Sequence, residues 1–323
     1  MQRNLNNDEL FLISILLNDE DLTNFCSANQ QTYKLVNKIG QYKLNRDFMQ
    51  YSDSFKDLYF LNNNLIKYKL LLSLKKIKEY YELEDYYDLK NNLTKLFYLE
   101  KLDISTLKSN KNVYYRTENK QFLIEICQLL NLKVLKVNSH DLEHIPKEIA
   151  QLRNLEKLVL NENNIATLPL EIYQLRNLLT LDLNYNDIKD FPREIRQLYN
   201  LKYLYLTGNE IKDFPREICQ LHNLQELHLS YNYITELPTD ITQLQNLQEL
   251  YLIDNDFKIF PMEICKLSNL KILDLRRNKI TYLPKEISEL QNLEELYLNG
   301  NKIRNVPQEI RQMAKLQIYY SDN

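Results

Sequence analysis

Glycine is scarce in this sequence, and its scarcity excludes several kinds of nucleotide site. Gly40, Gly208 and Gly300 stand far apart in the 323 residues. Loops that cradle phosphates need several glycines within a few positions of one another, so neither a P-loop nor a dinucleotide-binding fingerprint can form. We therefore expect the chain to use no cofactor.

The chain also lacks a long apolar run and a strong charge of either sign. Its longest apolar run, residues 10–17, contains a serine and is far shorter than the roughly 20 residues of a membrane-spanning helix. It has neither the cationic start nor the cleavage site of a secretory signal. A net charge of −3 provides no basic field for nucleic acid or anionic lipid. We expect an intracellular, cytoplasmic protein that binds neither.

What the sequence does contain is a 23-residue repeat. The pattern LxxLxLxxNxIxx[LF]Px[ED]IxxLxN begins at Leu132. It restarts without a slip at Leu155, Leu178, Leu201, Leu224, Leu247, Leu270 and Leu293. All 8 prolines occupy one position of the pattern, from Pro146 to Pro307. Repeats of this length are typical of solenoids, in which each unit buries its apolar side against the next.

These repeats resemble the leucine-rich repeat family, strongly over residues 132–315 and more weakly back to about residue 99. The resemblance implies an α/β solenoid in the form of a horseshoe. Its parallel sheet would line the concave side, with short helices or 3-10 turns on the convex side. In each unit the Leu-x-Leu alternation predicts a short strand with every second side chain in the core.

Three polar positions of the repeat have simple structural interpretations. The asparagine after each strand can satisfy unpaired backbone groups where the chain turns. Proline is predicted at the first position of a short helix, where its missing N–H costs nothing. The acidic residue two places later, such as Glu194, complements the positive end of that helix. A cation-binding ladder is the alternative for this acidic row, but we favour the first interpretation and expect no metal site.

The cysteines follow the same repeat. Cys219 and Cys265 share one position two units apart, and Cys127 lies four units before Cys219. At about 4.8 Å per stacked strand, the closest pair is about 10 Å apart, which is too far for a disulfide. We predict buried, reduced thiols. No cluster of ligands a few residues apart suggests a metal site.

The side chains that alternate with the core leucines form the predicted binding surface, because leucine-rich repeat proteins usually bind partners on the concave face. The predicted binding residues are Tyr185, Tyr203, Tyr205, Glu226, His228, Tyr231, Glu249, Tyr251, Asp274 and Tyr297. Aromatic clusters are common anchors of protein interfaces. We predict a non-enzymatic module that binds a basic and apolar protein segment. The alternative is that tyrosine is simply abundant, with 24 in the chain.

Catalysis has two weaker arguments in its favour. His228 lies two residues from Glu226, but the sequence pairs neither with a nucleophile. The chain also resembles the leucine-rich ubiquitin ligases of bacteria, which carry a separate catalytic domain with a cysteine nucleophile. We expect no such domain after residue 323. We therefore expect that the protein is not an enzyme.

The first fifty residues have a different pattern, with helical apolar spacing before and after the acidic residues 19–21. They resemble a degenerate F-box over about residues 5–48, in the diverged form of large DNA viruses. The resemblance implies a substrate receptor that docks on the adaptor of a cullin ubiquitin ligase, in the host cytoplasm if viral. Its docking residues would be Leu16, Leu22 and Phe25. The family's Leu-Pro and tryptophan are absent, and a simple cap on the solenoid is the alternative.

The predicted organisation has five segments. A helical F-box-like module (1–50) and a helical linker or cap (51–98) form a small all-α region. An irregular first repeat (99–131), with a polar insertion, precedes eight regular repeats (132–315) and a C-terminal cap (316–323). Leu316 and Ile318 predict one more strand there. Tyr319 and Tyr320 either cover the last repeat, or the edge pairs with another copy.

Overall fold

The computed structural model describes residues 99–105 and 119–320. The chain divides into two compact units, and the second one contains residues 100–107 and 113–323. The predicted segments 1–50 and 51–98 lie outside the described residues, as do the docking residues Leu16, Leu22 and Phe25. Within the described ranges no helix combines the length and apolarity needed to cross a membrane.

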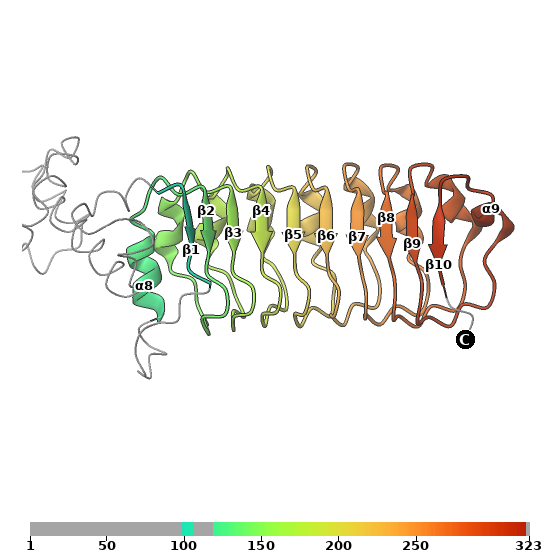
Figure 1. The fold of residues 1–323 in the computed structure, drawn as a ribbon, viewed down its shortest axis with the longest axis horizontal. Coiled ribbons are helices and arrows are strands. Elements are labelled where there is room, and N and C mark those ends of the chain that lie inside the picture. The colour runs from blue at the N-terminus through green and yellow to red at the C-terminus, as the bar shows by residue number, and fades with distance from the viewer. Residues whose placement is uncertain (1–98, 106–118, 321–323) are drawn as a thin grey trace, which may run out of the picture. The chain divides into compact units, whose positions relative to one another are not determined.

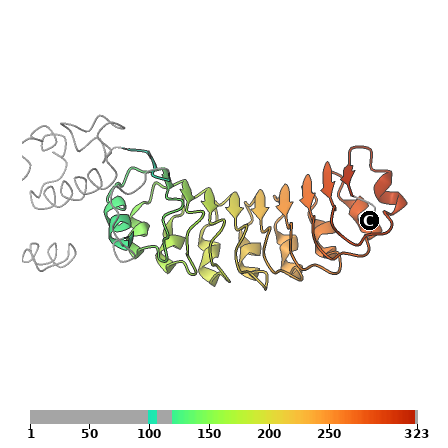
Figure 2. The ribbon, with the colours of Figure 1, turned by 60° about the horizontal axis from the view of Figure 1, so that its bottom comes forward.

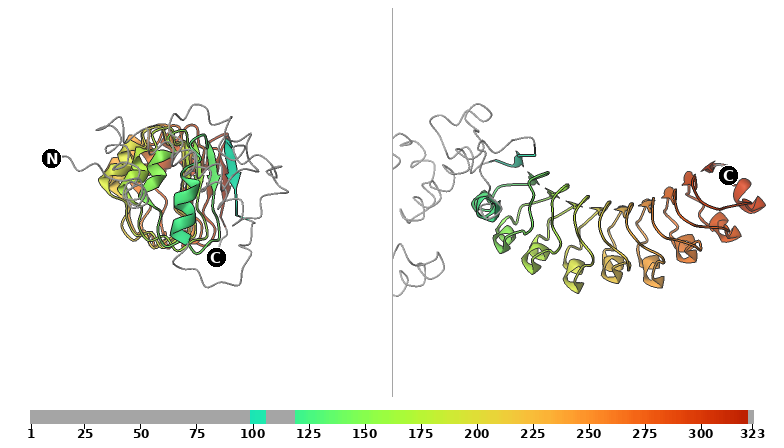
Figure 3. Two further views of the ribbon diagram at one scale, coloured as in Figure 1. Left: turned by 90° about the vertical axis from the view of Figure 1, so that its left-hand side faces the viewer. Right: turned by 90° about the horizontal axis from the view of Figure 1, so that it is seen from below.

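Parallel strands in sequence order form one sheet (Figure 1). The sheet begins with β1 (Lys101–Asp103) and ends with β10 (Gln317–Tyr319). Between them lie β2 (Val134–Lys136), β3 (Lys157–Val159), β4 (Thr180–Asp182), β5 (Tyr203–Tyr205), β6 (Glu226–His228), β7 (Glu249–Tyr251), β8 (Ile272–Asp274) and β9 (Glu295–Tyr297). The strands line the inner side of the curved array (Figure 3). The parallel sheet of the predicted solenoid is therefore confirmed.

Short helices lie on the outer side of the array (Figure 2). Most are five-residue 3-10 helices: η2 (Lys147–Gln151), η3 (Leu170–Gln174), η4 (Arg193–Gln197), η5 (Arg216–Gln220), η6 (Thr239–Gln243), η7 (Met262–Lys266) and η8 (Lys285–Glu289). Two α-helices, α8 (Asn119–Ile126) and α9 (Gln308–Arg311), lie near the ends of the array. The repeated acidic residue falls in the first turn of η2–η8 and of α9.

The position predicted for proline is wrong by one residue. Pro192 immediately precedes η4 and has an extended backbone, with φ −73° and ψ 160°. Its carbonyl accepts the first hydrogen bond of the turn, from the N–H of Ile195 at 3.1 Å. Proline thus caps a 3-10 turn, where the i to i+3 bond makes the residue before the helix an acceptor.

The core lies between the sheet and the outer helices. Three fully buried side chains illustrate this core: Leu204 of β5, Ile195 of η4, and Leu198, which directly follows η4. Adjacent strands place their central leucines side by side, as with Leu181 and Leu204. No unit can cover its own apolar flank, so the stability of each repeat comes from its neighbours.

The cysteine prediction is confirmed for the three cysteines among the described residues. Cys127, Cys219 and Cys265 are buried and free. Burial raises the pKa of the Cys219 and Cys265 thiols to about 12. These thiols therefore stay protonated near neutral pH and are unreactive.

Seven asparagines form a continuous column beside the sheet, which we call the asparagine ladder: Asn163, Asn186, Asn209, Asn232, Asn255, Asn278 and Asn301. Each is buried. The amide nitrogen of Asn232 donates to the carbonyls of Leu206 (2.9 Å), Leu229 (3.1 Å) and Ser230 (3.2 Å). Its amide oxygen accepts the N–H of Ile211 at 3.0 Å. The predicted role of this asparagine in satisfying the turning backbone is confirmed.

The residue before each ladder asparagine has a left-handed backbone, with φ between 53° and 75°. Gly208 is one of two glycines at this position. A Cβ on Gly208 would lie 2.5 Å from Cδ1 of Tyr185, whose ring covers the glycine. The tyrosine ring therefore crowds this position of the following repeat.

Gly208→Ala should therefore destabilise the array by about 2 kcal/mol, since the new methyl group adds a clash to the cost of a left-handed backbone. Urea unfolding of the wild type and of the variant measures the difference. In a Tyr185→Ala background the clash is absent, and the same substitution should cost only about 1 kcal/mol. Equal costs in the two backgrounds would show that the ring does not constrain Gly208.

The last strand departs from the regular spacing. Ile318 of β10 lies beside Leu296 of β9, so paired residues are 22 positions apart here and 23 apart between β2 and β9. Leu316 consequently lies just before the strand. Tyr319 is on the inner face of the sheet, where it stacks on Tyr297 with ring centroids 4.5 Å apart.

Candidate protein-binding face

The inner face of the sheet carries two rows of side chains, one on each side of the central leucines. On β5 to β9 the first row consists of Tyr203, Glu226, Glu249, Ile272 and Glu295. The second row consists of Tyr205, His228, Tyr251, Asp274 and Tyr297. Most of these side chains are half-buried. Parallel pairing of the strands thus places the predicted binding residues of β5 to β9 next to one another on this face.

Three rings of the second row form an aromatic stack across adjacent strands. The ring centroids of Tyr205 and His228 are 4.6 Å apart, and those of His228 and Tyr251 are 4.1 Å apart. In-register pairing of parallel strands places equivalent side chains within contact distance. Tyr205, His228 and Tyr251 together make one continuous aromatic surface, which we call the aromatic stack.

Glutamates of the first row hold the tyrosine hydroxyls. Tyr205 donates to Glu226 at 2.9 Å, and Tyr251 donates to Glu249 at 2.7 Å. Burial and the adjacent carboxylates raise the pKa of both tyrosines, so their hydroxyls remain neutral donors. Burial also raises the pKa of Glu226. The face therefore combines neutral aromatic rings with a row of carboxylates, an arrangement that attracts cationic groups.

Asp274 differs from the exposed carboxylate that the sequence predicted. It is fully buried and accepts hydrogen bonds from Nε (2.9 Å) and Nη2 (2.5 Å) of Arg276. The guanidinium carbon of Arg276 lies 5.1 Å from the ring centroid of Tyr297. This part of the face therefore presents the guanidinium of Arg276 and not the carboxylate. Extending the strand alternation by two residues would have identified Arg276 from the sequence.

Tyr185 and Tyr231 lie at the margin of the face, on the turns that follow β4 and β6. Both have left-handed backbones with φ of 54° and are about half exposed. Arg277 lies with its guanidinium carbon 5.9 Å from the Tyr231 ring centroid and donates to Asp254 at 2.8 Å. Bulky residues rarely adopt this backbone conformation. These two tyrosines project beside the sheet and not from it.

The aromatic residues are confined to one part of the inner face. Towards β1 the second row contains Asp103, Lys136, Val159 and Asp182. Lys136 forms an ion pair with Asp103 at 2.8 Å. Aromatic side chains begin at β5 and continue to Tyr319 on β10. This uneven distribution within the described strands argues against a uniform abundance of tyrosine as the explanation.

His228, the middle ring of the aromatic stack, also has a perturbed pKa. Burial lowers its pKa to about 4. Its Nε2 atom is buried and has no hydrogen-bond partner within the described residues, and Glu226 lies 3.8 Å away. The imidazole is therefore neutral near pH 7 and acts as an aromatic surface.

The low pKa of His228 predicts a loss of stability in acid. Below the ordinary histidine pKa of about 6.5 the unfolded chain binds a proton that the folded chain excludes, so stability falls as pH falls from 6.5 towards 4. The loss should approach about 3 kcal/mol at pH 4. His228→Phe, which keeps the ring but cannot titrate, should remove this contribution. Urea unfolding of both proteins at pH 7, 5.5 and 4.5 measures it, and parallel pH profiles would refute the assignment.

Family comparisons match the repeat region. The profile described as "Leucine-rich repeat region" matches residues 192–264. The profile described as "Leucine rich repeat" matches residues 130–188, 153–211 and 261–318. Together they cover more than half of the 323 residues. The chain belongs to the leucine-rich repeat family, whose members typically serve as protein-interaction modules.

Solved structures give the same result. The leucine-rich repeat ectodomain of the Arabidopsis thaliana membrane receptor kinase GASSHO1/SCHENGEN3, in complex with Casparian strip integrity factor 2, is 30% identical with a TM-score of 0.55. The match covers 60% of this chain and 24% of the receptor chain. Internalin C2 of Listeria monocytogenes is 28% identical with a TM-score of 0.54, covering 60% of this chain and 83% of its own. No curated protein matches the sequence.

Proposed function

We propose that the protein is a non-enzymatic interaction module that binds a segment of a partner protein on the inner face of its sheet. The observation that carries the proposal is the aromatic stack of Tyr205, His228 and Tyr251, flanked by Glu226 and Glu249. Large aromatic side chains gathered at the centre of a surface are the usual energetic anchors of interfaces. The similar plant ectodomain, solved with a bound factor, supports this use of the fold.

The partner segment should carry basic and apolar side chains. Neutral tyrosine rings favour contact with lysine, arginine and apolar groups. The carboxylates of Glu226 and Glu249 favour positive charge, although each also accepts a tyrosine hydroxyl. A rigid stack on parallel strands loses little side-chain entropy when it binds, which favours affinity.

Affinity purification from the cells that express the protein tests the proposal. The triple variant Tyr203→Ala, Tyr205→Ala, Tyr251→Ala should lose the proteins that the wild type recovers, as quantified by mass spectrometry. Tyr199→Ala is the matched control, because Tyr199 is 50% exposed and lies between η4 and β5, away from the strands. Equal recovery by the triple variant and the wild type would exclude the inner face as the binding site.

A second candidate function rests on the F-box resemblance of residues 5–48, which precede the repeats. In this case the protein is an intracellular substrate receptor, and Leu16, Leu22 and Phe25 contact the adaptor of a cullin ubiquitin ligase. The full chain should then recover that adaptor, and Leu22→Asp with Phe25→Asp should abolish its recovery. Failure to recover the adaptor, or recovery that survives both substitutions, would reject this candidate and leave the first one intact.

A further inference from the structure

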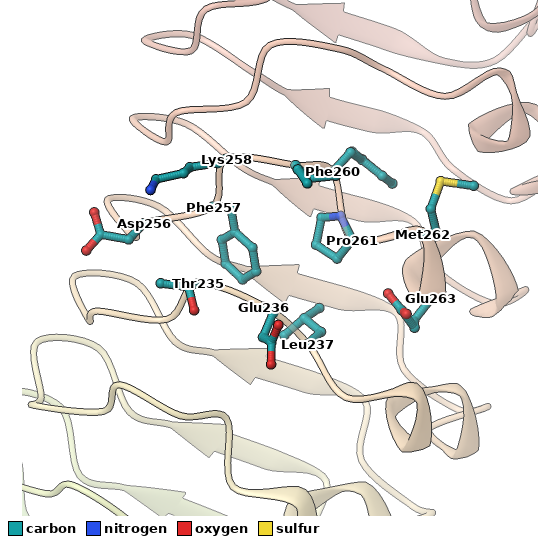
Figure 4. A pocket seen from close by; sticks show the side chains of 11 residues that line it. Thr235, Glu236, Leu237, Asp256, Phe257, Lys258, Phe260, Pro261, Met262 and Glu263 are labelled. Carbon is teal, nitrogen blue, oxygen red and sulfur yellow. The ribbon is translucent and has the colours of Figure 1, made fainter.

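A second surface lies away from the inner face, between two neighbouring repeats. The segments that follow β6 and β7 border a hollow of about 440 Å³, open to solvent, on the path from the strands to η6 and η7 (Figure 4). Its lining residues are Thr235, Glu236, Leu237, Asp256, Phe257, Lys258, Ile259, Phe260, Pro261, Met262 and Glu263. This volume is typical of sites that accept a small ligand or a few side chains.

The repeat that contains this hollow departs from the pattern at two surface positions. Ile259 is 81% exposed and stands where the preceding repeats carry His144, Thr167, Asp190, Asp213 and Glu236. Met262 is 44% exposed and stands where four other repeats carry Lys147, Arg193, Arg216 and Lys285, and only Leu170 is also apolar at this position. The fold does not require these apolar side chains, because other repeats form the same turns with polar ones.

Below the exposed pair the hollow has an apolar floor. Leu237, Phe257 and Phe260 are buried there. Ile259 and Met262 extend this apolar surface to the solvent, and Tyr282, at the Ile259 position of the next repeat, is 67% exposed. Exposed apolar side chains grouped around a hollow typically mark an interaction site.

The charges around the hollow determine the chemistry of its occupant. Glu236, Asp256 and Glu263 line it, against the single lysine Lys258. Asp256 is paired with Lys279. No ion pair within the described part of the chain involves Glu236 or Glu263. The two carboxylates are therefore free to meet a positive charge beside the apolar floor.

We infer that this hollow is a second docking site, which takes an aliphatic or aromatic side chain of a peptide segment flanked by lysine or arginine. The apolar side chain enters over Phe257 and Leu237, and its basic neighbours approach Glu236 and Glu263. The site is separate from the aromatic stack, so the chain can hold two segments at once. Two linked segments would bind more tightly together than either does alone.

Panning a phage-displayed random peptide library on the full chain tests this inference. Fluorescence polarisation then measures each enriched peptide with the wild type and with variants. One group of peptides should carry an apolar residue flanked by lysine or arginine. Its affinity should fall at least tenfold with Ile259→Ser plus Met262→Ser, and at least threefold with Glu236→Gln plus Glu263→Gln.

Two controls separate this site from the inner face. Leu170→Ser alters an exposed apolar residue at the repeat position of Met262 and should leave the affinity unchanged. Tyr205→Ala plus Tyr251→Ala should also leave it unchanged, whereas peptides bound by the inner face lose affinity with that variant. The inference is overturned if no enriched peptide depends on Ile259 and Met262, or if the dependent peptides carry acidic flanks.

Discussion

Asn232→Ala should lower the free energy of unfolding of the repeat array by about 3 kcal/mol or more, because each buried polar group left unpaired costs about 1–3 kcal/mol. The substitution removes one hydrogen bond to the N–H of Ile211 and three to carbonyls in its own and the preceding repeat. Asn232 is only 4% exposed, so water cannot replace these contacts without a rearrangement of the turn. Urea unfolding followed by circular dichroism measures the loss.

Asn223→Ala is the matched control for this prediction. Asn223 is the last residue of the repeat that precedes the one with Asn232. Its side-chain amide also donates to a backbone carbonyl, that of Tyr199, at 2.8 Å. It is exposed, so water can take its place and the cost should stay below about 1 kcal/mol. If the two substitutions cost the same, the ladder does not stabilise the array through buried hydrogen bonds.

The second large effect concerns binding. For a partner recovered by affinity purification, Tyr205→Ala with Tyr251→Ala should weaken the affinity at least a hundredfold, since two central aromatic anchors contribute about 2 kcal/mol or more each. The rings of Tyr205 and Tyr251 also both pack against the ring of His228, which lies between them in the aromatic stack. Isothermal titration calorimetry with the purified partner measures the change.

Folding of the double variant must be checked separately. Both tyrosines are half-buried and the central leucines stay in place, so the unfolding midpoint should change little. Glu226→Gln with Glu249→Gln keeps acceptors for the tyrosine hydroxyls while removing charge. The two substitutions should lower the affinity for a basic partner several-fold and make that affinity less dependent on salt concentration. An affinity within threefold of the wild type in the double alanine variant would contradict the proposed anchors.

The sequence predicted most of the fold because the fold is periodic. A 23-residue spacing places equivalent leucines in one core, and the sheet confirms this at pairs such as Leu204 and Leu227. The ladder asparagine and the buried cysteines were predictable for the same reason. Each has one environment that the repeat reproduces from unit to unit.

Other features depend on contacts of particular side chains, which the 23-residue period alone does not specify. Asp274 pairs with Arg276 two residues further along the same repeat, and the ring of Tyr185 crowds position 208 of the next repeat. Proline lies one residue earlier relative to its helix than predicted, both before the 3-10 turns and before the α-helix α9. The hollow lies where Ile259 and Met262 replace the polar residues of most other repeats, and a consensus pattern does not record such substitutions.

Photo-crosslinking tests most directly whether the inner face binds the partner. A photoreactive phenylalanine analogue replaces Tyr251 in one protein and Tyr199 in another, and both are irradiated with the purified partner. Tyr251 lies in the aromatic stack, whereas Tyr199 lies away from the strands. We expect a crosslink from position 251 that excess unlabelled wild-type protein suppresses, and none from position 199. A crosslink from position 199 with none from position 251 would contradict the account.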